Sequence, residues 1–435
     1  MRVVVAGGGL GGLTAALRAA ELGARVVLLE KGERPGGSFL LSSGYVWSYK
    51  DMATYRREAP GGDVVLQEQV LERLGTGLAW LERAGGVVLA RETGNPLTFG
   101  ARFDPARTVE ALVEHVLASG AEVLAGTALE ALTEEKGHVT GVRASTSGKR
   151  VEYAADAVVL ASGGFAANPD LVGRYIIGGP GALPVRAHPR STGDGFLAAL
   201  ERGARASTGL GEFYGRNLPA PPARFQPGRF VEVSQLYGRH AVAVNARGER
   251  YADEGADWSE TALTRATARQ PGTYAYYILD AAGLRVRVRE RTVDEMVGVA
   301  RKVGGTVIEA ASLEELADGL GLPRDALLRT LEDYNEAVVS GKGMIPPRTG
   351  PAGPLREPPF VAVKVAPYIT HTVGGLAVDG GCRVLRGADG RPIPGLYAAG
   401  VEVGGVSTGG YTSGLASALV FGRTAAESAL ADVQE

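Results

Sequence analysis

The sequence predicts an α/β fold in which a Rossmann-like nucleotide-binding domain is interrupted by a second, α+β domain. Three observations lead to this prediction. A glycine-rich turn follows the first apolar run, and two later apolar runs also lead into glycine pairs. In addition, proline- and glycine-rich stretches at residues 178–184 and 346–359 separate the middle of the chain from its two ends. We therefore expect the two ends to form one domain together.

Composition excludes several classes of protein. The 435 residues suffice for two domains, and the contents of 45% hydrophobic and 22% charged residues are typical of a soluble globular protein. A net charge of -2 argues against a partner such as nucleic acid. Cys382 is the only cysteine, which excludes an intrachain disulfide, a CxxC pair and a cysteine-ligated iron–sulfur cluster. Any redox chemistry must therefore come from a bound cofactor.

The N-terminal segment carries no targeting signal that we recognise. The apolar run ahead of the first glycines is too short for a signal peptide, and no 18-residue apolar stretch follows later. We expect no membrane insertion and a cytoplasmic location.

Residues 3–31 read as strand, tight turn, helix and strand. Gly7, Gly9 and Gly12 fit the pattern G-x-G-x-x-G between the first strand and the helix. This pattern lets the backbone turn tightly, approach a pyrophosphate and pack the helix on the strand. Glu30 ends the second strand, where a carboxylate can accept both hydrogens of a ribose diol. The segment therefore predicts a dinucleotide site.

Two further strand ends decide which dinucleotide is expected. The apolar run within residues 155–165 leads into Gly163-Gly164, and the run within residues 393–405 leads into Gly404-Gly405. An open α/β sheet binds ligands at the carboxyl ends of its strands, so three such ends indicate one long ligand crossing the sheet edge. An NAD site would not need the third strand end, and we therefore expect FAD.

Several motifs resemble the FAD-dependent fumarate reductase/succinate dehydrogenase flavoprotein superfamily, from Arg2 to about Ala429. They are GGGLGG (7–12), EKGERPGGS (30–38), VVLASGGF (158–165), TGDG (192–195), THTVGGL (370–376) and GLYAAG (395–400). Residues 36–47, 245–258 and 413–423 are most similar to the tricarballylate dehydrogenase and 3-ketosteroid dehydrogenase branches.

The resemblance implies a glutathione-reductase-type FAD-binding domain with an inserted substrate-capping domain. We place the FAD-binding domain at residues 1–185 and 367–435, and the capping domain at residues 186–366. No histidine occupies residues 36–47, where the covalent members attach their flavin, so noncovalent FAD is implied. Further FAD contacts are implied at Gly11, Lys31, Gly37, Ser38, Ser43, Gly44, Ala128, Ala161, Gly163, Asp194, Gly400 and Glu402.

Ser413 precedes a helix of small residues and is a candidate N-cap. The N–H groups of the first turn, including that of Leu415, would then point at the flavin O2 and supply positive potential there. The alternative is a helix that simply packs closely on the FAD-binding domain.

The sequence departs from the fumarate reductases at both substrate-binding arginines. Trp258 lies in the segment after Asp253-Glu254, and Tyr411 lies in the segment after the GGV motif. Neither segment has an arginine at the position where the fumarate reductases carry one. Fumarate is therefore not the expected substrate, because neither residue supplies a fixed positive charge. Tyr237 and Tyr411 are candidates for hydrogen bonding a carbonyl or for acid/base catalysis, and the alternative is that each is a buried structural tyrosine.

The histidines supply the remaining catalytic candidates. His371 stands where the fumarate reductases carry the second histidine of HHTMGG, so the resemblance implies that it faces the substrate; the alternative is a histidine bonded to a backbone carbonyl. His188 lies in a cationic cluster that the resemblance places near the flavin. Arg239 is a further candidate. No histidine pair has metal-ligand spacing, so no metal is expected.

The sequence therefore predicts an FAD-dependent oxidoreductase that dehydrogenates or reduces the CH–CH group of a small organic acid or cyclic ketone, in a pocket between the two domains. Its partners would be that substrate and an electron donor or acceptor that the sequence does not identify. The alternatives are a flavin oxidase of another substrate class, and a flavin-binding assembly or sensor protein without turnover.

Overall fold

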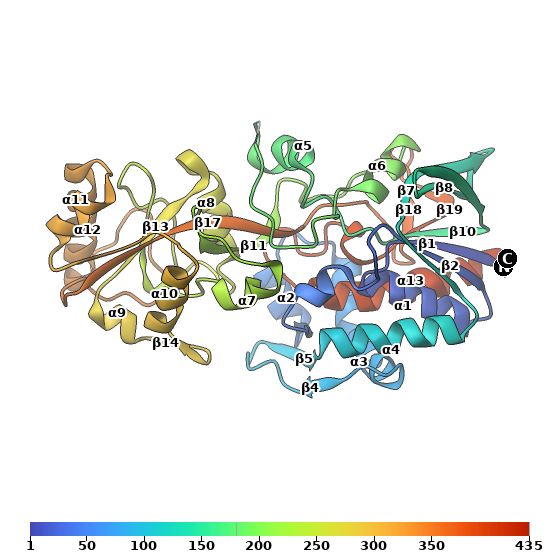
Figure 1. Ribbon diagram of the computed structural model, residues 1–435, viewed down its shortest axis with the longest axis horizontal. Coiled ribbons are helices and arrows are strands. Elements are labelled where there is room, and N and C mark those ends of the chain that lie inside the picture. The colour runs from blue at the N-terminus through green and yellow to red at the C-terminus, as the bar shows by residue number, and fades with distance from the viewer. Residues whose placement is uncertain (180, 435) are drawn as a thin grey trace. The chain divides into compact units, whose positions relative to one another are not determined.

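The computed structural model describes residues 1–179 and 181–434. The chain divides into two compact units (Figure 1). Unit 1 consists of Met1–Ala182, Ala187–Phe213 and the C-terminal part from His371, and unit 2 consists of Leu183–Arg186 and Tyr214–Thr370.

Residues 187–213 belong to unit 1, although we had assigned them to the inserted domain. This segment contains helix α6 (Asp194–Glu201). The Asp194 carboxylate lies 2.9 Å from Lys31 Nζ, an ion pair with the segment that follows the second strand. Before Phe213 only Leu183–Arg186 belong to unit 2, and the chain then stays in unit 2 from Tyr214 to Thr370.

A six-stranded sheet forms the centre of unit 1, in the order β18-β19-β10-β1-β2-β6. All neighbouring strands are parallel except β18 and β19. The strands are β1 (Arg2–Ala6), β2 (Arg25–Glu30), β6 (Glu122–Ala125), β10 (Ala157–Leu160), β18 (Arg383–Leu385) and β19 (Pro392–Ala398). Since β19, β10 and β1 are neighbours and parallel, the three glycine-marked strand ends meet at one edge, which confirms that expectation.

Both faces of this sheet are covered, which explains why Val3–Ala6 of β1 and the whole of β10 are apolar and have almost no exposed surface. Helices α1 (Leu10–Glu21) and α13 (Gly414–Gln434) lie on one face (Figure 1). An antiparallel sheet of β7 (Thr127–Glu135), β8 (His138–Thr146) and β9 (Lys149–Ala154) lies on the other.

The remaining elements of unit 1 surround this core. They are η1 (Gly37–Leu41), β3 (Tyr45–Tyr49), α2 (Met52–Glu58), α3 (Val64–Arg83), β4 (Val88–Ala90), β5 (Thr98–Phe103), α4 (Pro105–Ala118), α5 (Pro169–Val172), η2 (Gly173–Ile177), α6 and η6 (Gly400–Glu402). Helix α4 shows how the local sequence sets a boundary: Asp104 accepts a hydrogen bond from the N–H of Arg107, and Pro105 occupies the first turn.

Unit 2 is built on an antiparallel sheet with the order β11-β17-β13-β12, to which β16 adds by pairing with β17. Its strands are β11 (Phe213–Pro219), β12 (Val242–Val244), β13 (Ala275–Leu279), β16 (Val307–Ala310) and β17 (Phe360–Thr372). Alternate residues of β13 belong to different cores: Tyr277 packs in one cluster, and Tyr276 and Ile278 pack in another. The sheet is therefore buried on both faces.

Helices cover the two faces of the unit 2 sheet. They are α7 (Phe230–Val233), α8 (Thr261–Ala268), α9 (Ala281–Arg285), α10 (Val293–Lys302), α11 (Leu313–Leu320) and α12 (Arg324–Ser340), and a hairpin of β14 (Arg287–Val288) and β15 (Arg291–Thr292) precedes α10. A short break separates the last two helices. Gly321 ends α11 in the left-handed conformation, with φ of 64°.

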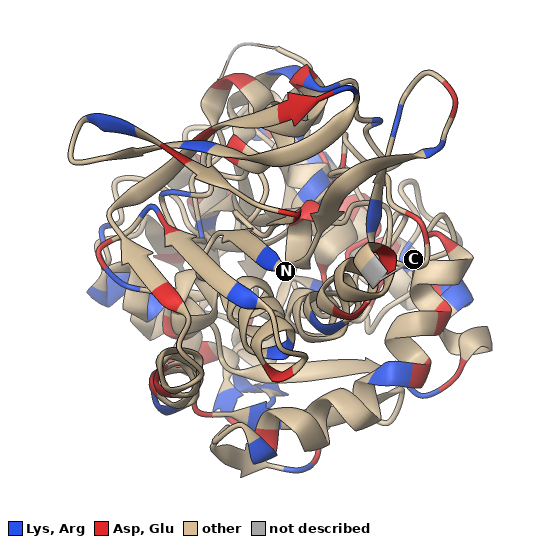
Figure 2. Cartoon of the chain, turned by 90° about the vertical axis from the view of Figure 1, so that its right-hand side faces the viewer, with Lys and Arg blue, Asp and Glu red and all other residues tan. Residues whose placement is uncertain are grey.

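Charged residues of both signs are mixed over the ribbon, as Figure 2 shows from one side. This agrees with the near-zero net charge of the chain. Within residues 1–179 and 181–434, no helix combines the length and the apolar content needed to cross a bilayer.

A buried ion cluster lies inside unit 2. Glu254 is fully buried, and its carboxylate lies 2.6 Å from Arg250 Nη2 and 3.0 Å from Arg348 Nη1. The ring of Tyr334 lies beside both guanidinium groups, 5.7 Å from each. Glu254 pairs with Arg250 and also with Arg348 of the proline-rich segment 346–359. The cluster therefore joins this segment to the hairpin that contains Arg250, because buried charges are stable only when they are paired.

We predict that Glu254→Gln lowers the free energy of unfolding by about 3–5 kcal/mol, because it leaves two buried arginines without a counter-charge. Urea denaturation of the purified variant measures this change. Glu357→Gln is the matched control. It removes an exposed partner of Arg285, at 2.7 Å, and should change stability by less than about 1 kcal/mol. Equal effects of the two substitutions would contradict the prediction.

Candidate functional site

The turn between β1 and α1 is closed on one side and open on the other. A Cβ atom at Gly7 would lie 2.3 Å from the Ala161 carbonyl oxygen, and one at Gly12 would lie 1.8 Å from the Gly7 carbonyl oxygen. Neither position can therefore hold a side chain. A Cβ atom at Gly9 would meet nothing within 4 Å. Space is thus left at the N-terminus of α1, where helix N–H groups attract a pyrophosphate.

Glu30 lies at the end of β2 with its carboxylate held in place. Oε2 accepts a hydrogen bond of 2.9 Å from the N–H of Gly8, and Oε1 accepts one from the N–H of Gly32. The side chain is 8% exposed. A carboxylate has about four lone-pair sites, so two remain for the hydroxyls of a ribose. The backbone bonds orient the acid for that contact.

Lys31 and Asp194 bridge the segment after β2 and the start of α6. Lys31 Nζ also donates to Thr192 Oγ1 at 2.7 Å, and Arg190 Nη1 donates to the Lys31 carbonyl at 2.7 Å. The bridge therefore places Asp194 at the same sheet edge as Glu30.

His188 lies beside this bridge and not at the expected flavin end. Its backbone N–H donates to Ser38 Oγ at 2.9 Å. Burial lowers the pKa of the His188 imidazole, and the nearby charge of Glu30 opposes that effect. Since Glu30 and Ser38 are expected at the nucleotide, we withdraw His188 as a catalytic candidate. The sequence cluster that suggested it lies at the nucleotide end of the site.

Ser162 joins the second and third strand ends. Its hydroxyl donates to Glu402 Oε1 and accepts a hydrogen bond of 3.0 Å from the N–H of Gly195. Glu402 is fully buried, and burial raises the pKa of its carboxyl group, with the Ser162 bond opposing that shift. The ends of β10 and β19 and the start of α6 are thereby tied together.

The other expected FAD contacts fall on four parts of unit 1. A Cβ atom at Gly37 would lie 3.3 Å from Gly9 Cα, so the loop before η1 passes the phosphate turn. A Cβ atom at Gly11 would lie 3.2 Å from the Gly400 nitrogen. Ser43 and Gly44 directly precede β3, and Ala128 pairs with Ser145 between β7 and β8.

Ser413 is the N-cap of α13, as expected. Its Oγ accepts a hydrogen bond of 3.3 Å from the N–H of Ala416 and donates one of 3.3 Å to the Tyr45 carbonyl. The N–H groups of the first residues of a helix have no intrahelical partner, so that end of α13 presents a positive partial charge. Leu415 lies in this first turn.

His371 and Tyr411 lie together beside that helix end. A Cβ atom at Gly414 would lie 3.1 Å from His371 Nε2, and the rings of His371 and Tyr411 are 6.3 Å apart between centroids. His371 Nδ1 lies 3.1 Å from the Thr372 carbonyl oxygen. Because a carbonyl only accepts, Nδ1 carries a hydrogen, and in a neutral imidazole Nε2 is then an acceptor.

Aromatic side chains hold Tyr411 in position. The Trp47 and Tyr411 rings meet edge to face at 5.5 Å, and Tyr49 donates from its hydroxyl to the Tyr411 carbonyl at 2.7 Å. Strand β3 therefore determines where the Tyr411 ring lies relative to His371.

Tyr237 is part of the core of unit 2. It is fully buried, and its hydroxyl donates to Gln235 Oε1 at 2.8 Å. Burial raises its pKa well above the usual value. Tyr237 is therefore a buried structural tyrosine, and we withdraw Tyr237 as a catalytic candidate.

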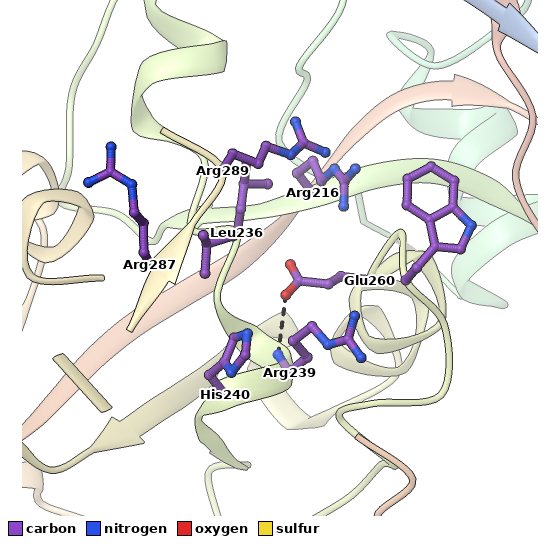
Figure 3. Close-up of a pocket in the computed structure, with 9 residues that line it drawn as sticks. Arg216, Leu236, Arg239, His240, Glu260, Arg287 and Arg289 are labelled. Carbon is purple, nitrogen blue, oxygen red and sulfur yellow. Dashed lines mark hydrogen bonds between the residues drawn. The ribbon is translucent and has the colours of Figure 1, made fainter. Parts of the chain in front are cut away.

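Arg239, in contrast, lines a pocket inside unit 2 (Figure 3). The pocket also contains Arg216, Glu260 and Arg289, which the sequence analysis did not single out. The alternation of arginines in RVRVRER (285–291) was the available signal.

The residues at the sheet edge of unit 1 fit FAD. The open space at Gly9 suits the pyrophosphate, the fixed carboxylate of Glu30 suits a ribose, and the N-terminus of α13 suits the electronegative edge of a flavin. Across residues 1–179 and 181–434, no group of three or more His, Cys, Asp or Glu side chains is placed to hold a metal ion.

Comparison with known proteins agrees with this fit. The family described as FAD binding domain matches residues 2–417. The NADH:fumarate oxidoreductase of Klebsiella pneumoniae (strain 342) is 30% identical over 98% of this chain, and the chain spans 47% of that relative, about half its length.

Solved structures show the same fold over both units. A flavocytochrome c3 fumarate reductase in its open conformation has a TM-score of 0.74 and 26% identity, over 100% of this chain and 78% of that chain. A 3-ketosteroid delta1-dehydrogenase from Sterolibacterium denitrificans has a TM-score of 0.79 and 20% identity, over 99% of each chain. The predicted Rossmann-like FAD-binding fold with an inserted domain is confirmed.

We predict that Glu30→Ala weakens FAD binding by about 10- to 100-fold, which corresponds to about 1–3 kcal/mol of lost ribose bonding. Titration of the FAD-free protein with FAD, followed by flavin fluorescence, measures the affinity. Glu33→Ala removes an exposed carboxylate three residues away and should leave the affinity unchanged. An unaltered affinity for Glu30→Ala would remove Glu30 from the site.

Proposed function

Because the chain belongs to the family of FAD-binding domains, we propose that it is an FAD-dependent oxidoreductase acting on the CH–CH group of a small organic acid or a cyclic ketone. The observation that carries the proposal is the placement of His371 and Tyr411 at the N-terminus of α13, the helix end suited to the flavin. The NADH:fumarate oxidoreductase also matched by this chain points to the same reaction class.

FAD would be held by the three strand ends of unit 1, from the phosphate turn at Gly9 to the first turn of α13. When bound, FAD supplies the hydride-accepting or hydride-donating centre. The protein contributes the position of the cofactor and positive potential from α13 beside the flavin carbonyls. Leu415 would provide a backbone N–H there.

His371 is the group that we assign to the substrate. Its Nδ1–H is occupied by the Thr372 carbonyl, so the ring is fixed and Nε2 is the working atom. A protonated Nε2 would donate a hydrogen bond to a substrate carbonyl or carboxylate and polarise it, and a neutral Nε2 would accept a proton. The Tyr411 hydroxyl is the second candidate for this contact.

The remaining parts of the proposal stand as expectations. FAD is expected to be noncovalent because residues 36–47 contain no histidine. The electron donor or acceptor is not identified, since the matched relative is about twice as long as the region that it shares with this chain. The cytoplasmic location expected from the sequence also remains a prediction.

Anaerobic rapid mixing tests the proposal. The purified protein is loaded with FAD, and the bound flavin is followed after mixing with saturated and unsaturated acids and cyclic ketones. Reduction or reoxidation by a member of one of these classes supports the proposal. Hydrogen peroxide formed with an alcohol or amine substrate would indicate an oxidase instead, and a flavin that exchanges electrons with none of them would indicate a non-catalytic protein.

Release of the cofactor checks its attachment. Heat or acid should liberate intact FAD, which mass spectrometry identifies. Flavin that stays with the precipitated chain would contradict the noncovalent assignment.

We predict that His371→Ala lowers kcat/KM by about 100-fold or more while the FAD content and visible spectrum stay nearly unchanged, as for a positioned polar catalytic group. Steady-state kinetics on the substrate found above, together with the flavin-to-protein ratio, measure both effects. His115→Ala, an exposed histidine of α4, should behave as the wild type. If the variant loses FAD but the remaining holoenzyme turns over normally, His371 is structural.

We predict that the reduced holoprotein reacts with fumarate about 100- to 10,000-fold more slowly than the arginine-clamped fumarate reductases, because two charged hydrogen bonds worth about 1.5–3 kcal/mol each are missing at Trp258 and Tyr411. The rate of flavin reoxidation after mixing with fumarate measures this. Fast reoxidation would show that other arginines of the chain had replaced the clamp.

A further inference from the structure

Residues 411–413, which we call the lead-in segment, connect the last glycine-rich loop of unit 1 to helix α13. Hydrogen bonds from β3 hold its first and last residues. Tyr49 donates from its hydroxyl to the Tyr411 carbonyl at 2.7 Å, and Ser413 donates to the Tyr45 carbonyl at 3.3 Å. Tyr411 carries a candidate catalytic ring, and Ser413 caps the helix end suited to the flavin. The position of the lead-in segment therefore matters to both.

The middle residue of the lead-in segment is held by Tyr55 of α2. The Tyr55 hydroxyl donates to Thr412 Oγ1 at 3.1 Å. Both side chains are buried, with exposed fractions of 0% for Tyr55 and 2% for Thr412. Burial raises the pKa of the Tyr55 phenol, and the Thr412 bond opposes that shift, so the phenol stays protonated near neutral pH and remains a donor. Because a buried hydroxyl without a partner costs free energy, this bond fixes the two side chains on each other.

The surroundings of Tyr55 fix its own position. The rings of Tyr49 and Tyr55 lie 5.1 Å apart between centroids, a contact that adds to the stability gained from burial. Helix α2 begins at Asp51, whose carboxylate accepts a hydrogen bond of 2.7 Å from the N–H of Thr54. Tyr55 therefore reaches the lead-in segment from a rigid base.

The chain ahead of the lead-in segment is anchored by the same part of unit 1. Gln67 of α3 is fully buried, and its Nε2 donates to the Val406 carbonyl at 3.0 Å and to the Ala59 carbonyl at 2.9 Å. The N–H of Gly61 donates to the Thr408 carbonyl at 3.0 Å. The stretch before the lead-in segment therefore cannot shift freely, and the bonds from β3 and α2 set the position of the segment itself.

We propose that Tyr55 is a positioning residue for the flavin site and that, through Thr412, it sets where the Tyr411 ring and the first turn of α13 lie. Tyr55 exposes no surface, so it touches neither cofactor nor substrate and acts only through its partner. The N–H groups of that turn present a positive partial charge, which favours the more negatively charged reduced flavin when it lies beside the flavin carbonyls. This inference rests on the proposed function, which places the flavin at this helix end.

The reduction potential of the FAD-loaded protein tests the proposal without relying on turnover. Tyr55→Phe removes the hydroxyl and keeps the ring. During slow reduction beside a reference dye, the ratio of reduced to oxidised flavin at a given dye potential should fall by about 3- to 10-fold, because part of the helix-end contribution is lost. A tenfold change corresponds to about 30 mV for a two-electron couple. An unchanged ratio in the folded, FAD-loaded variant would overturn the proposal.

Tyr397→Phe is the matched control. Tyr397 is 2% exposed, and its hydroxyl donates to Asp432 Oδ2 at 2.6 Å, near the end of α13. The substitution therefore removes a buried tyrosine hydroxyl that is bonded at the opposite end of the same helix. We expect the potential to stay at the wild-type value. Equal shifts in Tyr397→Phe and Tyr55→Phe would overturn the proposal, since any loosening of α13 would then have the same effect.

Substitutions of the partner keep the proposal testable if Tyr55→Phe does not fold. Thr412→Val replaces the hydroxyl by a methyl group and should lower the ratio as Tyr55→Phe does. Thr412→Ser retains the hydroxyl and should keep the wild-type ratio. When Tyr55→Phe and Thr412→Val are combined, the two shifts should not add, because both substitutions remove the same bond. Additive shifts, or an equal loss in Thr412→Val and Thr412→Ser, would overturn the proposal.

The outcomes separate this inference from the proposed function. A potential that shifts in Tyr55→Phe and Thr412→Val but not in Tyr397→Phe, in a protein whose flavin reacts with no substrate, would support the positioning role and contradict the proposed function. Turnover of an organic acid or cyclic ketone, with the same potential in all of these variants, would overturn the positioning role and leave the proposed function standing.

Discussion

The contact between the Gly7 carbonyl oxygen and Gly12 constrains everything built on the edge of the central sheet. A Cβ atom at Gly12 would lie 1.8 Å from that oxygen, so only glycine lets α1 start where it does. A second constraint acts at Gly7 itself, where a Cβ atom would lie 2.3 Å from the Ala161 carbonyl oxygen at the end of β10. Two strand ends and one helix start therefore occupy positions that side chains would forbid, and the space left over, at Gly9, faces outward for a ligand.

The third strand end extends this edge toward the chemistry. Residues Gly400 to Glu402 follow β19 and lie against the start of α1, and Ser162 ties them to β10. The chain then forms the cap at Ser413 and enters α13. The same stretch of unit 1 thus determines where the phosphate turn, the buried Glu402 and the positive end of α13 lie. His371 is placed beside that helix end by the strand through which the chain returns from unit 2.

Different parts of this arrangement were predictable from the sequence to different degrees. The three strand ends, the Ser413 cap and the break after α11 depend on glycine, a capping hydroxyl and local periodicity, and these signals are read within about a dozen residues. The boundary near residue 213 was missed because it depends on the pairing of Lys31 with Asp194, which are distant in sequence. Tyr237 and His188 were misplaced for a similar reason, since burial and neighbours decide their roles. The pocket that Arg239 lines combines four separated segments, and only the part from residues 285–291 carries a local signal, its alternating arginines.

A crystal structure of the FAD-loaded protein is the most direct test of the account. We expect the pyrophosphate at the N-terminus of α1 beside Gly9 and a ribose in contact with Glu30. We also expect the carbonyl edge of the flavin to accept a hydrogen bond from the first turn of α13, with His371 facing the flavin ring. A flavin placed away from α13, or an FAD that bypasses one of the three strand ends, would contradict the central claim that these ends form a single site for one extended cofactor.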